Sequence, residues 1–320
     1  MSKPLTGSST DPESGDGWVY GPDETRYWGR YGAAGALIHD VDRGILLQHR
    51  VQWSHFGGTW GIPGGARHRD ETAVAAALRE CSEEAGVPAV DGTGIRLRAS
   101  YVLDLGFWSY TTVLSDATTR LNAQVTDRES LEVAWVPLGS VDSLPLHPGF
   151  AASWPVLSEA LGLQVTLVVD VANVVGSRPD GWWKDRSAAA QKFVARLGAL
   201  AETGIDVGEL DLPGTVGGTA RRWWPQEILA VVEGQAKGDW IADVNAASDG
   251  AGPRVIAAAH DGDSAIVQAT DETLGAPGHA EQKPDPVVIV VTADRELRGR
   301  VGRLGAQVRS PRWLLDKIPG

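Results

Sequence analysis

Residues 64 to 87 read Gly64-Gly65-Ala66-Arg67-His68-Arg69-Asp70-Glu71-Thr72-Ala73-Val74-Ala75-Ala76-Ala77-Leu78-Arg79-Glu80-Cys81-Ser82-Glu83-Glu84-Ala85-Gly86-Val87. The apolar residues recur at helical spacing, which predicts a helix over Glu71–Ala85. At about 100° per residue, the side chains of Glu80, Glu83 and Glu84 share one face of this helix. The adjacent face is apolar, formed by Val74, Ala77, Leu78, Cys81 and Ala85. We therefore expect the helix to pack on a sheet and to present three carboxylates.

The acidic face has two interpretations. One is a solvated surface, because like charges three or four residues apart repel by only about 0.2–0.5 kcal/mol per pair. The other is a cation site, because converging carboxylates suit Mg²⁺ or Mn²⁺, which bind oxygen ligands and substrate phosphates. The glycine pair before the helix favours the second interpretation, since glycine lets the backbone approach a ligand closely.

This segment resembles the box of the Nudix hydrolases, Gly-x5-Glu-x7-Arg-Glu-U-x-Glu-Glu-x-Gly-U, where U is a bulky apolar residue. The spacing is intact, and the matching residues are Gly65, Glu71, Arg79, Glu80, Glu83, Glu84, Gly86 and Val87. Cys81 at the first U position is a mild departure, since cysteine behaves as a small hydrophobe.

The resemblance implies metal-dependent hydrolysis of a nucleoside diphosphate linked to another group. It assigns Mg²⁺ (or Mn²⁺) to Glu80, Glu83, Glu84 and the carbonyl of Gly64, and it makes Glu80 catalytic. Glu71 and Arg79 would orient the loop and the helix through a charge-assisted hydrogen bond. The metal would neutralise the diphosphate and activate or orient the attacking water.

The general base and the nucleotide are less defined. Such families often place an acid in the loop before the last strand, here Thr126–Ser130. We favour Glu129, with Asp127 and Glu132 as alternatives, and each of them could equally be a solvated loop acid. Trp53, His55, Phe56, Trp60, Trp108 and Tyr110 could stack a base, although aromatic residues in short strands more often belong to the core.

The chain divides into three regions. Residues 1–25 are polar and predict a disordered lead-in. For residues 26–162 the resemblance to the Nudix hydrolases implies an α/β/α sandwich with a mixed sheet. Its expected strands are Gly32–Ile38, Ile45–Arg50, Trp60–Pro63, Arg96–Leu105, Trp108–Leu114 and Leu131–Pro137, and its second helix is about Ala151–Leu161.

Residues 163–320 predict a parallel α/β domain, because apolar runs alternate with helical patterns. The runs are Val165–Val171, Val255–Ala259 and Val287–Thr292, the helices are Ser187–Leu200 and Asp294–Leu304, and Gly275–Pro286 is an expected loop. An acid follows each run: Asp170, the group His260-Asp261-Gly262-Asp263, and Asp294. Each acid could cap a helix, or the acids could meet where parallel sheets bind ligands.

The residues around Asp170 and Asp294 resemble the first and last acidic motifs of PIN-like nucleases of the NYN type. That resemblance implies Mg²⁺ or Mn²⁺ bound by Asp170, Asp263 and Asp294, with Asn173 in support, and cleavage of RNA. The basic residues between Arg295 and Lys317 could contact phosphates or form a solvated helix face. The segment with Trp182, Trp183, Trp223 and Trp224 fits no motif, which leaves the second acid of this site the least defined.

Composition limits the possible partners. The formal charge is −12, from 41 acidic and 29 basic side chains, so a polyanion site must be locally basic or assisted by a metal. The single cysteine cannot form an internal disulfide, which fits a reducing compartment. The apolar runs are too short to span a bilayer, and the amino terminus lacks a signal-peptide pattern. We expect a cytoplasmic protein that does not contact membranes and binds a nucleotide-diphosphate small molecule.

Overall fold

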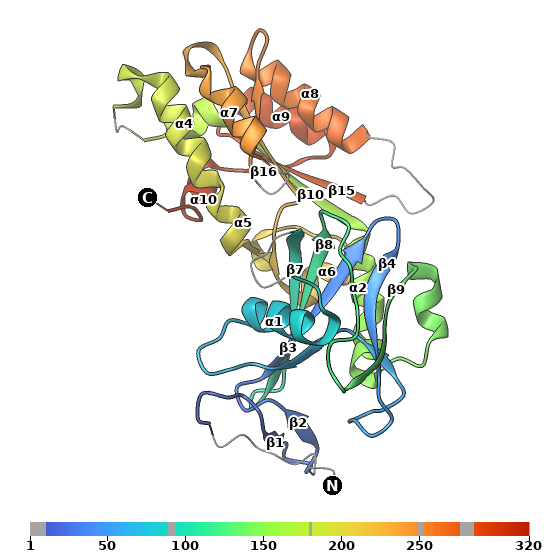
Figure 1. Cartoon of the computed structure of the whole chain (residues 1–320). Coiled ribbons are helices and arrows are strands. Elements are labelled where there is room, and N and C mark those ends of the chain that lie inside the picture. Colours follow the sequence, from blue (N-terminus) through green and yellow to red (C-terminus); the bar gives the residue numbers. More distant parts are fainter. Residues whose placement is uncertain (1–10, 89–93, 179–180, 249–251, 276–284, 320) are drawn as a thin grey trace. The chain divides into compact units, whose positions relative to one another are not determined.

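The computed structural model describes residues 11–88, 94–178, 181–248, 252–275 and 285–319. The chain forms two compact units (Figure 1). The first unit comprises residues 1–159 and 218–221, and the second comprises residues 160–217 and 222–320. No helix among the described residues is long and apolar enough to cross a membrane. The expected α/β class is confirmed.

The first unit is built on a mixed sheet, and the helix α1 (Ala73–Ala85) packs on one face of it. Its elements are β1 (Trp18–Tyr20), β2 (Arg26–Trp28), β3 (Ala33–Asp40), β4 (Gly44–Arg50), β5 (Trp60–Gly61), β6 (Gly64–Ala66), α1 (Ala73–Ala85), β7 (Ile95–Asp104), β8 (Ser109–Ala117), β9 (Ser130–Val136), the 3-10 helix η1 (Leu138–Ser143) and α2 (Pro148–Leu161).

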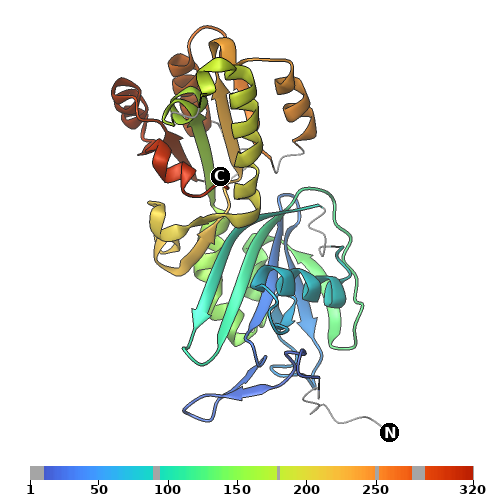
Figure 2. The same ribbon diagram turned by 90° about the vertical axis from the view of Figure 1, so that its left-hand side faces the viewer.

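Strand β3 lies at the centre of this sheet. It pairs parallel with β8 and antiparallel with β4 and β6, while β9 pairs with β4 and β7 with β8. The side chains of Ala36, Ile38 and Val113 point toward α1 and pack with its buried residues Leu78 and Cys81. Residues alternate between faces along a strand, so Leu37 and Leu114 point to the opposite face. That face is covered by α2 (Figure 2).

The second unit contains a five-stranded parallel sheet in the order β14-β13-β10-β15-β16. The strands of this sheet are β10 (Leu163–Asp170), β13 (Glu227–Val232), β14 (Arg254–Ala257), β15 (Asp285–Val291) and β16 (Gln307–Arg309). Two shorter strands lie outside it, β11 (Ile205–Asp206) and β12 (Ala220–Trp223), and the first two residues of β12 belong to the first unit. Its helices are α3 (Val171–Gly176), α4 (Arg186–Leu197), α5 (Ala199–Thr203), α6 (Val216–Thr219), α7 (Trp240–Ala247), α8 (Gly262–Gly275), α9 (Arg295–Leu304) and α10 (Pro311–Leu315), with 3-10 helices Trp182–Lys184, Val207–Glu209 and Gly234–Ala236.

Continuous apolar strands explain this parallel sheet, because both of its faces are covered. Val168, Leu229 and Val290 pack with α8 and α9 on one face. Helix α4 lies on the other face (Figure 1). Strands β11 and β12 pair with each other outside this sheet, and β12 is the neighbour of β7 at the edge of the first unit's sheet.

Three expectations differ from the structure. The prediction of a disordered lead-in is wrong for β1, where Trp18 pairs with Trp28 and their rings lie 5.1 Å apart. The strand expected at Trp60–Pro63 covers only Trp60–Gly61, which is β5 and pairs with β4. A separate strand, β6, follows it at Gly64–Ala66 and pairs with β3. Strand β13 was not predicted, although its residues Ile228–Val232 are all apolar. The first ten residues and most of the expected loop Gly275–Pro286 lie outside the described residues.

Candidate functional site

Helix α1 has defined signals at both ends. The hydroxyl of Thr72 accepts a hydrogen bond from the N–H of Ala75, which satisfies a free donor of the first turn. Gly86 ends the helix with φ +64°, a left-handed conformation that glycine adopts without strain. The apolar stripe ending at Ala85 is buried against the sheet, so the face that carries Arg79 is fixed against the Gly64–Gly65 turn.

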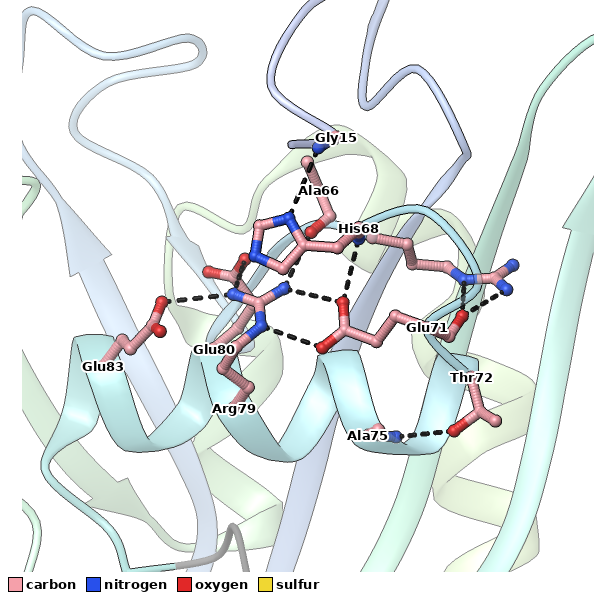
Figure 3. A network of polar contacts seen from close by, with 10 residues as sticks. Gly15, Ala66, His68, Glu71, Thr72, Ala75, Arg79, Glu80 and Glu83 are labelled. Atoms are coloured by element: carbon pink, nitrogen blue, oxygen red, sulfur yellow. Dashed lines mark hydrogen bonds and ion pairs between the residues drawn. The ribbon is translucent and has the colours of Figure 1, made fainter. Parts of the chain in front are cut away.

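Arg79 is the centre of a polar network (Figure 3). Its Nε and Nη2 atoms donate to the two carboxylate oxygens of Glu71 at 2.9 and 3.0 Å. Nη2 also donates to the carbonyl of Ala66, and Nη1 donates to Glu80 Oε1 at 2.8 Å. The predicted hydrogen bond between Glu71 and Arg79 is therefore present, and it ties the loop to the second turn of α1.

Glu71 holds the loop from its other side as well. Its carboxylate accepts a hydrogen bond from the N–H of His68, and its carbonyl accepts from the side chain of Arg67. Burial acts to raise the pKa of Glu71, but the hydrogen bonds from Arg79 and His68 outweigh it and lower the pKa. Glu71 is therefore an anion with fixed partners, as expected of an orienting group.

Two of the three aligned carboxylates meet the glycine turn. Glu84 is buried, and its Oε2 accepts a hydrogen bond from the N–H of Gly64 at 2.8 Å. The carboxyl group of Glu80 lies where a side chain at Gly65 would begin, since a Cβ there would be 2.7 Å from three Glu80 atoms. Glycine at position 65 thus makes room for the Glu80 carboxylate.

Burial is the main cause that raises the pKa of both Glu80 and Glu84. The charge of Glu83 also raises the pKa of Glu80, and the charge of Glu80 raises the pKa of Glu84. Arg79 partly offsets the effect at Glu80. The turn therefore concentrates negative charge that the described side chains do not fully balance.

Glu83 stands apart from this pair. Its side chain is 60% exposed, and its Oε2 lies 3.2 Å from Arg79 Nη1. Among the residues that the structure describes, no group of three or more His, Cys, Asp or Glu side chains is arranged to hold a metal ion. The donor set nevertheless fits Mg²⁺, because it combines hard oxygen atoms with buried, incompletely compensated charge beside a glycine turn.

Other residues around Glu84 were not predicted. Tyr110 is half-buried, and a Cβ at Gly35 would lie 2.2 Å from its hydroxyl oxygen, so glycine leaves room for the phenol there. Burial and then the charge of Glu84 raise the pKa of the Tyr110 phenol. Arg50 lowers the pKa of Glu84 through its charge, so a cation is also close to this carboxylate. Only the three-dimensional pairing of β3, β4 and β8 brings these residues to the turn.

The three candidates for the general base have different surroundings. Glu129 is exposed, and its carbonyl accepts a hydrogen bond from the N–H of Val51. Glu132 is also exposed. Asp127 accepts from the hydroxyl of Ser130, whose oxygen accepts from Gln48 Nε2 at 2.7 Å. Gln48 also lowers the pKa of Glu84, so Asp127 is linked to the buried carboxylate by a chain of side chains.

Several aromatic residues lie near one another in the loop after β4. His55 contacts Trp18 and Phe56, with ring centroids 5.5 and 4.2 Å apart, and Phe56 contacts His147. Phe56 is 45% exposed and has φ +56°, an unfavourable conformation for an aromatic residue. Trp60 instead stacks on His49. Phe56 is therefore the more accessible of these two rings.

The second unit brings three of the sequence-selected residues together. Asp170 Oδ2 accepts a hydrogen bond from the hydroxyl of Thr292, and Thr292 Oγ1 accepts from the N–H of Asp294. Asn173 Oδ1 accepts from the N–H of Ala293. Asp170 and Asp294 also cap α3 and α9. These acids therefore cap helices and also share one edge of the sheet.

Asp263 and an acid that was not predicted face the same edge. Burial and then the charge of Asp294 raise the pKa of Asp263, with a smaller contribution from Glu233. Burial chiefly raises the pKa of Asp170, and Asp263 and Glu233 add to it. Glu233 directly follows β13 and accepts a hydrogen bond from the N–H of Gly262. The apolar run before Glu233 was the available signal for this fourth acid.

Comparison with known proteins identifies the family to which the first unit is similar. Residues 29–159 match the family model of the NUDIX domain. A Mycobacterium tuberculosis protein described as "Putative 8-oxo-dGTP diphosphatase 3" is 50% identical over 156 residues, covering 46% of this chain and 70% of that protein. A Bifidobacterium longum protein described as "Nucleoside triphosphate pyrophosphatase/Nudix hydrolase fusion protein" is 38% identical over 151 residues, covering 45% of this chain and 31% of that protein.

A solved structure is also similar in sequence. The crystal structure of the Nudix hydrolase RenU from M. smegmatis is 46% identical and covers 46% of this chain and 95% of its own, with a TM-score of 0.42.

Proposed function

This chain belongs to the Nudix family, and from that premise we propose that its first unit hydrolyses a nucleoside diphosphate linked to another group, with Mg²⁺ or Mn²⁺ as cofactor. The enzyme is thus a pyrophosphohydrolase that acts on acid anhydrides. The observation that carries the proposal is the placement of Glu80 and Glu84 against the Gly64–Gly65 turn. A buried carboxylate, Glu84, and a half-buried one, Glu80, favour a divalent cation there.

We propose a role for each residue of the site. Glu80, Glu83, Glu84 and the Gly64 carbonyl would hold the cation, which supplies charge neutralisation and an acidified water when bound. Arg79 and Glu71 position Glu80 and the loop. Glu129 is our first choice for the general base, and the hydrogen-bond chain through Ser130 makes Asp127 its main competitor.

The names of the relatives indicate which substrate to test first. The M. tuberculosis relative is described as acting on 8-oxo-dGTP, so we propose an oxidised purine nucleoside triphosphate. Assays with that compound, unmodified nucleoside triphosphates and nucleotide sugars would identify the group that is linked to the nucleoside diphosphate. We expect one class of substrate to be hydrolysed with Mg²⁺ and not with EDTA.

A paired substitution tests the assignment of the site. Glu83→Gln with Glu84→Gln removes two of the proposed cation ligands, and we expect turnover to fall by about 10²-fold or more. Asp42→Asn with Asp142→Asn is the matched control, because it removes the same charge at exposed positions of the same unit. Normal turnover by the glutamine pair would refute the assignment.

The acidic edge of the second unit favours a second candidate function. We propose that Asp170, Asp263 and Asp294 bind Mg²⁺ or Mn²⁺ for cleavage of RNA, as in PIN-like nucleases, with the first unit acting as a nucleotide sensor. The shared hydrogen bonds through Thr292 and the nearby charge of Glu233 support it.

Single-stranded RNA incubated with Mn²⁺ tests this candidate. We expect cleavage that Asp170→Asn with Asp294→Asn abolishes and that added nucleotide changes in rate. An absence of cleavage, or cleavage that survives the asparagine pair, would exclude it. Cleavage at a rate that added nucleotide does not change would support the nuclease activity of the second unit and exclude a sensor role for the first.

A further inference from the structure

The structure divides the basic carboxy-terminal run into paired and unpaired cations. Four of its cations lie within 4 Å of an acid, in the pairs Arg300–Asp263, Arg309–Asp211, Arg312–Asp316 and Lys317–Glu209. The other three, Arg295, Arg298 and Arg303, are exposed and form no ion pair with any residue that the structure describes. All three lie on α9.

Two of these arginines are unfavourable for the helix that carries them, whereas Arg303 lies in the last turn, where positive charge is favoured. Arg295 and Arg298 lie in the first turns of α9, where the helix dipole repels positive charge. They are also three residues apart, a spacing at which like charges repel. The fold itself therefore gains nothing evident from placing cations at this end of α9.

Two glycines occupy the same outer face. At 100° per residue, Gly299 and Gly302 lie on the face of α9 opposite the buried Leu297 and Val301. Viewed down the helix axis, Arg295 projects between the two glycines. A Cβ at either glycine would meet no atom within 4 Å, so packing does not require glycine at these positions. Glycine weakens a helix interior relative to alanine. Sequences that break local rules without structural compensation often do so at functional sites.

The result is a smooth strip of backbone with arginines along it. Arg298 lies on one side of the glycine pair and Arg303 on the other, so a ligand can reach the backbone of α9 closely while three guanidinium groups contact it. Guanidinium groups bind phosphate through two parallel hydrogen bonds. A row of phosphates therefore complements this surface in both shape and charge.

We propose that the outer face of α9, formed by Arg295, Arg298, Gly299, Gly302 and Arg303, binds the phosphate backbone of single-stranded nucleic acid. The net charge of −12 disfavours a stiff duplex, which must lie along a larger part of the surface than a flexible strand. A membrane is not the partner, because this face has no apolar side chain to insert. The proposal requires neither hydrolytic activity.

Binding of fluorescein-labelled oligouridine RNA to the full chain, followed by fluorescence anisotropy in EDTA over a range of salt concentrations, tests the proposal. EDTA prevents metal-dependent hydrolysis, so failure of either proposed activity does not affect the measurement. Arg295→Gln with Arg298→Gln and Arg303→Gln should weaken binding by about tenfold or more and lower the salt slope by about 2.

Two further variants separate local contacts from charge and folding. Lys184→Gln with Arg254→Gln and Arg312→Gln removes three exposed charges elsewhere in the second unit and should retain affinity. Gly299→Ala with Gly302→Ala should raise the midpoint of thermal unfolding yet weaken binding, since methyl groups would cover the strip. Absence of binding, an equal loss in the charge control, unchanged binding by the alanine pair, or tighter binding of a duplex or of anionic vesicles would overturn the proposal.

Discussion

Glu84 is a buried carboxylate that lies near another acid, Glu80. Burial and the charge of Glu80 raise its pKa more than the Gly64 N–H, Arg50 and Gln48 lower it, so its charge is costly in the protein without metal. We predict that Glu84→Gln retains an acceptor for the Gly64 N–H and removes the repulsion from Glu80. The midpoint of thermal unfolding in EDTA should be unchanged or higher, while hydrolysis falls by about 10²-fold. A large loss of stability together with activity would contradict the proposed role, and Glu84→Asp provides a control that keeps the charge.

Asp116 gives a prediction for pH. Its carboxylate is buried and accepts two hydrogen bonds from Arg98, at 2.9 and 3.1 Å, with His39 Nδ1 3.3 Å away. Burial raises its pKa, but these partners outweigh it and lower the pKa below 3.8. The unfolded chain therefore binds the proton more readily, so this stabilisation is complete above pH 3.8 and is lost as pH falls through the folded pKa.

Asp116→Asn should lower the free energy of unfolding at pH 7 by about 2 kcal/mol. The variant should also show less loss of stability on acidification than the native chain. Urea unfolding at several pH values measures both effects, and Asp42→Asn serves as the exposed control. An acid dependence that is identical in the two proteins would show that other carboxylates are responsible.

At the scale of residues, sequence spacing predicted the contact between Glu71 and Arg79 but not the surroundings of the other acidic residues. The box identified Glu71 and Arg79 as partners, and the two groups are hydrogen-bonded. Spacing alone could not show that Glu83 turns toward solvent, because helix geometry fixes the direction of Cβ and not the rotamer. Nor could it find Glu233, which reaches the acidic edge only through the pairing of β13 with β10.

At the scale of elements, α1 depends on its first residue. The Thr72 hydroxyl is the acceptor for the Ala75 N–H, and this contact begins the helix directly after the loop that Glu71 holds. We predict that Thr72→Ala lowers the free energy of unfolding by about 1 kcal/mol. Thr72→Ser should restore most of it, as measured by chemical denaturation. If the alanine and serine variants were equally stable, the cap would not contribute.

The elements themselves were largely predictable where periodicity was clear. Helix α1 and strands β3, β4, β7, β8, β10 and β15 lie within a few residues of the expected ranges. Strand β1 was not predictable, because a three-residue strand depends on contacts such as Trp18 with Trp28 rather than on a pattern. The division between β5 and β6 likewise depends on different partner strands.

At the scale of the whole molecule, the first unit is not a single stretch of chain. Residues 218–221 belong to it, and β12 is the neighbour of β7 in the order of its sheet. The boundary expected at residue 162 would therefore remove a strand from the sheet that it was meant to delimit. This return of the chain could not be predicted, since Ala220–Trp223 has no apolar alternation that distinguishes it from a loop.

A truncation tests that connectivity. We predict that a fragment of residues 1–162 has a lower midpoint of thermal unfolding than the full chain and self-associates, because the edge of β7 is left unpaired. Differential scanning calorimetry and size-exclusion chromatography measure the two effects. A fragment that is monomeric and as stable as the first transition of the full chain would show that β12 is dispensable.

The network around Arg79 limits what that residue can do during turnover. Its five N–H groups are matched by five hydrogen bonds, two to Glu71 and one each to Glu80, Glu83 and Ala66. A guanidinium group whose five donors are all used cannot donate a further hydrogen bond to a departing phosphate. Unless Glu80 or Glu83 releases it, Arg79 has a structural role. An inhibitor designed to bind Arg79 from the solvent would find no N–H group available to donate a hydrogen bond.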